Sequence, residues 1–114
     1  MSEKFVHESE AFIASIFDYH DVKWEYEPNT LVLSTDDNGL IRRAFTPDFY
    51  LPEFDTYVEV TVMRKPGKKR RKIEMAIKNF PGINIILLCR DDIKILAEEY
   101  KYLLNTCAEE SFVL

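Results

Sequence analysis

One strand–helix–strand segment most limits the fold that this chain can adopt. Residues 57–62 are rich in β-branched side chains, residues 68–80 have a helical pattern, and residues 83–89 form a short apolar run. Two strands joined by a helix normally lie parallel in one sheet, and the helix covers a face of that sheet. The segment therefore predicts an α/β fold with this unit at its centre.

The rest of the chain adds a first helix, further strands and a last helix. Helical spacing of apolar residues predicts a helix over residues 8–19, alternation predicts a strand at 23–27, and residues 91–105 are predicted to form a final helix. The runs 31–33 and 40–45 flank an Asn-Gly pair, which is typical of a tight β-hairpin. This order predicts a mixed central β-sheet with helices on both faces, in a single domain that spans all 114 residues.

Two carboxylates stand where an unpaired charge is unfavourable. Asp48 follows Pro47 at the end of an extended segment, and Glu59 lies inside the strand of residues 57–62. Because side chains alternate along a strand, Glu59 faces away from the valines that flank it, and a β-hairpin would lay Asp48 beside it. A hard divalent cation is the natural partner of such a pair.

Each carboxylate also has an interpretation without a metal. Asp48 is compatible with a turn-forming aspartate after proline. Glu59 is compatible with an ion pair to Arg42, to Arg43 or to a lysine of the following helix. The spacing alone leaves these alternatives open.

The motif that these residues form resembles the PD-(D/E)XK nuclease superfamily. That pattern is Pro-Asp, a spacer, and then Asp/Glu-X-Lys on the next strand, and this chain has Pro47-Asp48 followed by Glu59-Val60-Thr61. The run of residues 45–52 is most similar to the small Holliday-junction-resolvase-like and very-short-patch-repair-like branches. The resemblance implies a restriction-endonuclease-like core and metal-dependent hydrolysis of phosphodiester bonds.

The sequence departs from this pattern at one position, because Thr61 stands where the lysine is expected. In the resembled family that lysine positions the attacking water and stabilises charge on the phosphate. The apolar stripe of the following helix, defined by Ile73, Ala76, Ile77 and Phe80, leads one turn earlier to cations instead of apolar residues. Lys69 and Lys72 are both candidates for the missing lysine, and a solvated start of the helix is the alternative.

The resemblance also implies a set of roles. Asp48 and Glu59 are expected to bind Mg²⁺ or Mn²⁺, with the backbone carbonyl of Val60 as a further ligand. Glu10, on the first helix, is expected to face the same site and to complete a second metal position or orient a water molecule. A surface position on that helix is the alternative for Glu10.

The charge distribution indicates where a polyanion would bind. The chain has 15 basic and 20 acidic residues, a net charge of −5. Seven basic residues lie within residues 64–72, and the rest of the chain then holds eight basic against 20 acidic residues, a net charge of −12. This patch is predicted to contact nucleic acid, or else to be a solvated helix face. Its members are Arg64, Lys65, Lys68, Lys69, Arg70, Arg71 and Lys72.

Two functions follow from these observations. The first is a metal-dependent DNA endonuclease, selective for DNA structure because so small a chain has little surface for recognising sequence. The second is a nuclease-fold protein that has lost catalysis and acts as a protein-binding or regulatory module, as Thr61 and the acidic remainder suggest. The expected partners are DNA, a second copy of the chain or another protein. No apolar run approaches the roughly 20 residues that span a membrane, and the start of the chain is unlike a signal peptide, so a cytoplasmic protein is expected.

Overall fold

The computed structural model describes residues 5–107, with side chains as far as residue 104. The helix predicted over residues 8–19 is confirmed, and so is the hairpin predicted on either side of the Asn-Gly pair. The helices are α1 (Glu8–Tyr19), α2 (Gly67–Asn79), α3 (Arg90–Glu99) and α4 (Lys101–Cys107), and the strands are β1 (Glu25–Tyr26), β2 (Leu31–Thr35), β3 (Ile41–Phe45), β4 (Phe49–Leu51), β5 (Thr56–Val60) and β6 (Ile85–Leu88).

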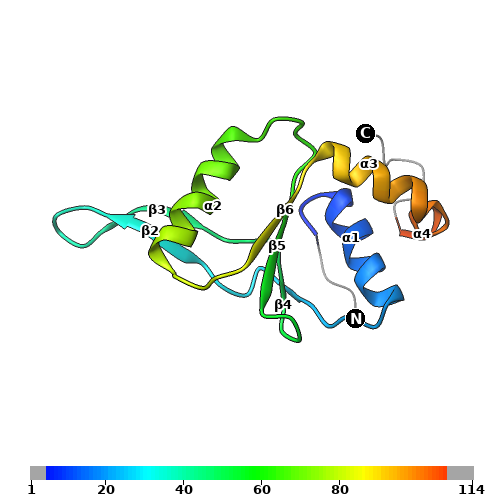
Figure 1. Cartoon of the computed structure of the whole chain (residues 1–114), viewed down its shortest axis with the longest axis horizontal. Helices are drawn as coiled ribbons and strands as arrows, with labels where there is room; N and C mark the ends of the chain where they lie inside the picture. Colours follow the sequence, from blue (N-terminus) through cyan, green and yellow to red (C-terminus); the bar gives the residue numbers. More distant parts are fainter. Residues whose placement is uncertain (1–4, 108–114) are drawn as a thin grey trace.

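The central sheet is mixed, as the sequence predicts. Its strand order is β1-β4-β5-β6, in which β5 and β6 are parallel and the other pairs are antiparallel. The parallel pair is the strand–helix–strand unit, because α2 connects β5 to β6. Strands β2 and β3 form a separate two-stranded hairpin, which extends from one side of the molecule, whereas α1, α3 and α4 gather on the other side (Figure 1).

Two hydrophobic cores lie against this sheet. The first joins α1 and α3 to β4 and β5 through residues such as Phe12, Phe49, Val58 and Ile93. The second joins the β2–β3 hairpin to α2 and β6, and its buried members are Leu31, Leu33, Phe45, Ile73 and Ala76. Helices therefore cover both faces of the sheet, and the second core holds α2 beside β5 and β6.

The alternation of β5 separates its apolar side chains from its acidic one. Val58 and Val60 lie in the first core, so Glu59 between them faces the opposite side, where α2 lies. In the β4–β5 hairpin, Phe49 pairs with Val58. The residue before β4, Asp48, therefore comes level with Glu59.

Three predictions about the fold are wrong in detail. The final helix over residues 91–105 is two helices, because Tyr100 leaves the helical conformation with φ −117° and ψ 34°. Its ring packs against Tyr19 and His20 at the end of α1, and α4 contacts α1 beyond the break. Five strands precede α2 where three or four are expected, and β1 is shorter than predicted.

The apolar stripe of α2 is also shorter than the sequence suggests. Ile73 and Ala76 are buried, but Ile77 is 48% exposed and Phe80 37% exposed. The second core therefore ends at the middle of α2. The helix α2 has 13 residues. Within the described residues, no helix is long and apolar enough to cross a membrane.

Ile73 and Ile77 provide a matched test of this packing. Replacing Ile73, which is 8% exposed, with alanine leaves a cavity between α2 and the hairpin and should lower the free energy of unfolding by about 2–4 kcal/mol. Ile77→Ala should cost under about 1 kcal/mol, since this side chain is half exposed. Urea unfolding measures the free energy of unfolding of both variants. Equal losses in the two variants would contradict the packing described.

Candidate active site

Asp48 and Glu59 are held together by the backbone of the β4–β5 hairpin. The backbone N–H of Asp48 donates to Oε1 of Glu59 at 3.0 Å, and the N–H of Val60 donates to Oδ2 of Asp48 at 2.8 Å. Asp48 is 6% exposed and Glu59 is 3% exposed. The expectation that a hairpin lays these carboxylates side by side is confirmed.

Lys69, in the first part of α2, reaches this pair from the opposite side. Its Nζ donates to Oε2 of Glu59 at 2.5 Å, so both oxygens of Glu59 have a partner. Of the partners considered for Glu59, the structure selects the helix lysine and not Arg42 or Arg43. Lys72 lies further along the helix and lines the adjoining cavity.

Thr61 is buried and has a local structural role. Its Oγ1 accepts a hydrogen bond from the backbone N–H of Met63 at 3.2 Å, just after the end of β5. A hydroxyl carries no positive charge. The cation beside Glu59 is therefore supplied by α2, ten residues further along the chain.

Glu10 approaches the pair from α1 and is buried, being 7% exposed, so the surface position considered for it is wrong. The hydroxyl of Tyr26 donates to Oε1 of Glu10, and the same hydroxyl accepts from the N–H of Val6 at 3.1 Å. Burial, together with the hydrogen bond to Glu10, raises the pKa of Tyr26, so its hydroxyl stays protonated and remains a donor. Sequence reasoning missed the contact of Tyr26 with Glu10, because the pattern of a strand does not show which of its side chains contacts a helix elsewhere in the chain.

The cluster has more negative than positive charge. Burial raises the pKa of Asp48 to about 8, with further contributions from the charges of Glu59 and Glu10, while the N–H of Val60 and the charge of Lys69 oppose the shift. Three buried carboxyl groups thus share one lysine. An added cation would relieve this imbalance.

Oxygen ligands of this kind fit a hard divalent cation. Mg²⁺ is commonly bound by one or two carboxylates, with waters and substrate phosphates completing the coordination. Asp48 and Glu59 provide that number. Among the side chains described, those of residues 5–104, no group of three or more His, Cys, Asp or Glu is arranged to hold a metal ion. The donor set therefore suits a cation that is shared with a substrate, and the role of the Val60 carbonyl stays a prediction.

A cavity lies beside the ion pair of Glu59 and Lys69. It has a volume of about 520 Å³ and lies between the end of β3 and the start of α2. Glu59 and Lys69 line it together with Lys68, Lys72 and Met63. A ligand in this cavity would contact the ion pair directly.

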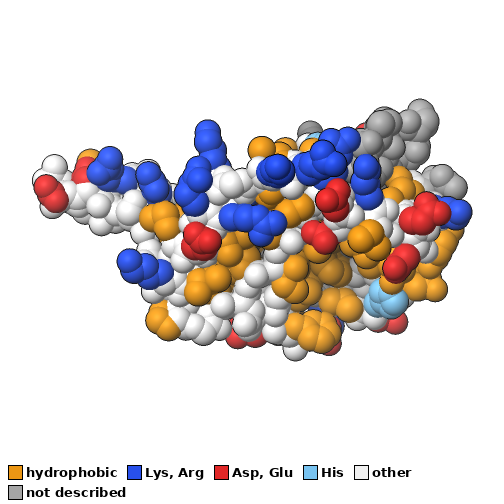
Figure 2. Space-filling model, turned by 45° about the horizontal axis from the view of Figure 1, so that its top comes forward, with side chains coloured by type: hydrophobic (Ala, Val, Ile, Leu, Met, Phe, Trp, Pro, Cys, Tyr) orange, Lys and Arg blue, Asp and Glu red, His pale blue; other side chains and the backbone are white. Residues whose placement is uncertain are grey.

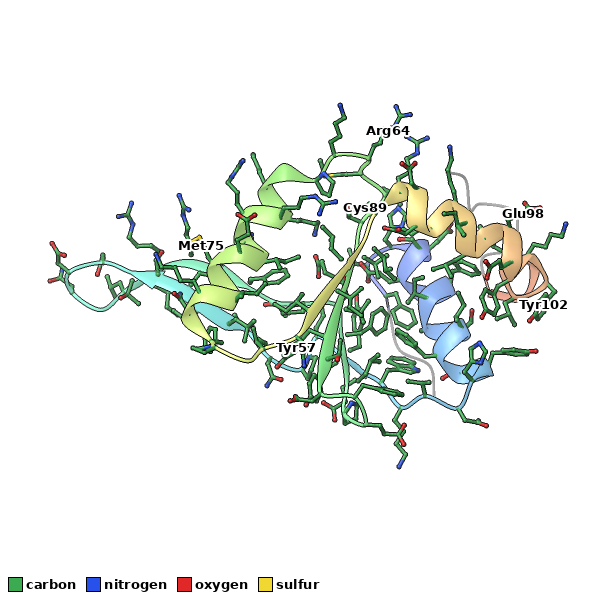
Figure 3. The ribbon with its side chains drawn as sticks, in the orientation of Figure 1. Tyr57, Arg64, Met75, Cys89, Glu98 and Tyr102 are labelled. Atoms are coloured by element: carbon green, nitrogen blue, oxygen red, sulfur yellow. The ribbon has the colours of Figure 1, made fainter. Side chains whose placement is uncertain are left out.

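The basic residues of the 64–72 segment do not form one surface. Lys68, Arg71 and Lys72 lie along the side of α2 that faces β3, whereas Arg70 donates to Sγ of Cys89 at 3.4 Å, at the end of β6. Arg64 and Lys65 are exposed in the loop that leads to α2, where Figure 3 labels Arg64. Helical geometry divides the patch, because residues that are adjacent in sequence point in different directions around a helix.

Comparisons with known proteins provide no independent identification. No protein-family model, no curated protein and no solved structure matches this chain. Its function therefore has to be argued from the residues of the site.

The burial of Asp48 predicts that stability depends on pH when divalent cations are removed by chelation. Its pKa is raised from 3.8 to about 8, so the folded chain keeps a proton that the unfolded chain releases. This contribution to stability is complete below a pH of about 4 and is lost as the pH rises through about 8. In Asp48→Asn the neutral side chain has no such proton.

Urea unfolding of both proteins in EDTA, at several pH values within this window, measures the effect. The free energy of unfolding of the wild type, relative to Asp48→Asn, should fall with rising pH by up to about 1.4 kcal/mol per pH unit. Groups that do not interact with Asp48 cancel in this difference. A difference that stays constant across the window would show that Asp48 is ionised throughout.

Proposed function

We propose that this protein is a metal-dependent DNA endonuclease of the PD-(D/E)XK type, with a restriction-endonuclease-like core. The observation that carries the proposal is an ion pair between Lys69 of α2 and Glu59 of β5. In the β4–β5 hairpin, Glu59 lies next to Asp48. The family's motif has a lysine two residues after the second carboxylate, and in this chain Thr61 stands there. Here α2 provides the lysine.

The residues have distinct roles in this proposal. Asp48, Glu59 and the carbonyl of Val60 would hold Mg²⁺ or Mn²⁺, which supplies Lewis-acid activation of water and phosphate when bound. Lys69 holds a positive charge where negative charge develops on the phosphate. Glu10 is fixed by the hydroxyl of Tyr26, and its carboxylate would orient the attacking water.

The energetics of burial favour a functional over a structural role for these residues. A buried ion pair contributes little net stability, because removing two charges from water offsets their attraction. A second and a third buried carboxyl group add a further cost without a further cation. Clusters of this kind, in which a pKa is strongly perturbed by burial and by neighbouring charges, are typical of active sites.

The proposed substrate is DNA in the cytoplasm, cut according to its structure. The chain has 114 residues, and residues such as Lys68, Arg71 and Lys72 offer contacts to phosphates but few to base edges. A homodimer would place two sites across a duplex or a junction. An inactive, protein-binding module remains the alternative, favoured by the absence of lysine at Thr61.

DNA cleavage separates these two functions. Labelled linear, nicked, flapped and four-way-junction DNA is incubated with Mg²⁺ or Mn²⁺ and with wild type, Asp48→Asn or Asp91→Asn. Wild type should cut at least one substrate only with metal, and Asp48→Asn should lose roughly 10³-fold or more in rate. Asp91 is exposed on α3, so Asp91→Asn is the matched control and should cut normally. No cutting by wild type in excess over DNA would support the inactive module instead.

Lys69 and Lys72 should differ in the kinetic parameter that they affect. Lys69→Gln removes the charge beside Glu59 and should lower kcat by roughly 10² to 10³. Lys72→Gln leaves that ion pair in place and should mainly raise KM. Thermal unfolding of both variants controls for loss of fold. A larger fall in kcat for Lys72→Gln would assign the catalytic lysine to position 72.

A further inference from the structure

A second cavity, of about 450 Å³, lies between β3 and α2. Arg42 and Arg43 line it from β3, and Lys68, Arg71 and Lys72 line it from α2. We refer to this cavity as the basic groove. Lys and Arg side chains follow the upper edge of the molecule from the hairpin across α2 (Figure 2).

The helical residues of the groove form one stripe. Lys68, Arg71, Lys72 and Met75 are spaced at three, four and seven residues, which is the repeat of one helix face. Met75, labelled in Figure 3, is the apolar member of the stripe. Nη1 of Arg43 donates to its Sδ at 3.7 Å, so the hairpin contacts the helix here. The groove thus depends on the docking of the hairpin onto α2.

Among the residues that the structure describes, none that lines the groove is acidic. Within the described part of the chain, the ion pairs are Lys69 with Glu59 and Lys101 with Glu98, so none of the five groove cations is neutralised by a carboxylate. The five positive charges that line the groove repel one another. The chain as a whole has a net charge of −5, so its positive charge is concentrated here. An anionic ligand with several charges would relieve this repulsion.

The groove is continuous with the candidate active site. Ala44, Lys68 and Lys72 line both the basic groove and the cavity that contains Glu59 and Lys69. A ligand that occupies both has to be extended and to carry repeated negative charges. At about 450 Å³ the groove is in the range of small-molecule clefts, roughly 300–1,000 Å³, so it suits one chain of phosphates and not a whole duplex.

We propose that the basic groove binds the phosphodiester backbone of one nucleic acid strand and guides it to Glu59 and Lys69, with Arg42 and Arg43 of the hairpin as phosphate contacts. The guiding role rests on the proposed nuclease function, whereas binding of the strand does not. The hairpin acts as an arm that closes the strand against α2. Arg42 and Arg43 are exposed, and neither belongs to a hydrophobic core.

The test is strand binding in EDTA, where no metal-dependent cleavage takes place. Fluorescence anisotropy of a short labelled DNA strand, and of RNA of the same sequence, is measured across a range of salt concentrations. The proteins are wild type, Arg42→Gln/Arg43→Gln and the control Lys23→Gln/Lys94→Gln. Lys23 and Lys94 are exposed and lie outside the groove, so the control loses the same charge elsewhere.

The groove variant should bind roughly tenfold more weakly at low salt, and the slope of log Kd against log salt should fall by about 1.4 for two lost contacts to a single strand. The control should retain nearly all of the affinity. An equal loss in the control, or no binding by wild type to either strand, would overturn the proposal. Dependence on Arg42 and Arg43 with RNA but not with DNA would identify RNA as the strand that the groove takes.

The same variants separate this proposal from the proposed function. Arg42→Gln/Arg43→Gln should raise KM for cleavage and leave kcat within roughly threefold, because neither arginine contacts the ion pair. Strand binding that depends on the two arginines, in a protein that cuts no DNA, would support the groove and overturn the nuclease. Cleavage and binding that are both unaffected by the double substitution would overturn the groove and leave the nuclease.

Discussion

The burial of Glu59 is the constraint on which the rest of the structure depends. Glu59 is 3% exposed within β5, and its charge is tolerated there because Lys69 and the N–H of Asp48 supply one partner for each carboxylate oxygen. One partner comes from the sheet and the other from α2. The position of α2 over the sheet is therefore fixed by a polar contact as well as by the second core.

A short stretch of chain connects the basic groove to the acidic cluster. Phe45 ends β3 in the second core, and Phe49 begins β4 in the first core. Asp48 is therefore held between two buried phenylalanines, and Pro47 beside it is fully buried. Because the hairpin that carries Arg42 and Arg43 leads directly into this stretch, the position of these two arginines relative to the carboxylates is set in part by local chain geometry.

Periodicity made part of this structure predictable. Alternation along β5 and its pairing with β4 in a hairpin were sufficient to predict that Asp48 lies beside Glu59. The register of a hairpin and the side to which each side chain points are both set by local sequence. The choice between Lys69 and Lys72 was not predictable, since it depends on how α2 is rotated and placed over the sheet. The contact of Tyr26 with Glu10, and the convergence of Arg42 and Arg43 on α2, join segments whose separation in sequence carries no pattern.

Supplying the lysine from a helix changes what the site depends on. A lysine two residues after Glu59 would be positioned by the same strand and would need only the sheet. Lys69 instead stays in place only while α2 is docked, and the docking is provided by Ile73 and Ala76, one and two turns further along the helix. These residues pack against the hairpin of the basic groove. The second core therefore maintains both the charge beside Glu59 and the walls of the groove, so a loss of packing there would affect both together.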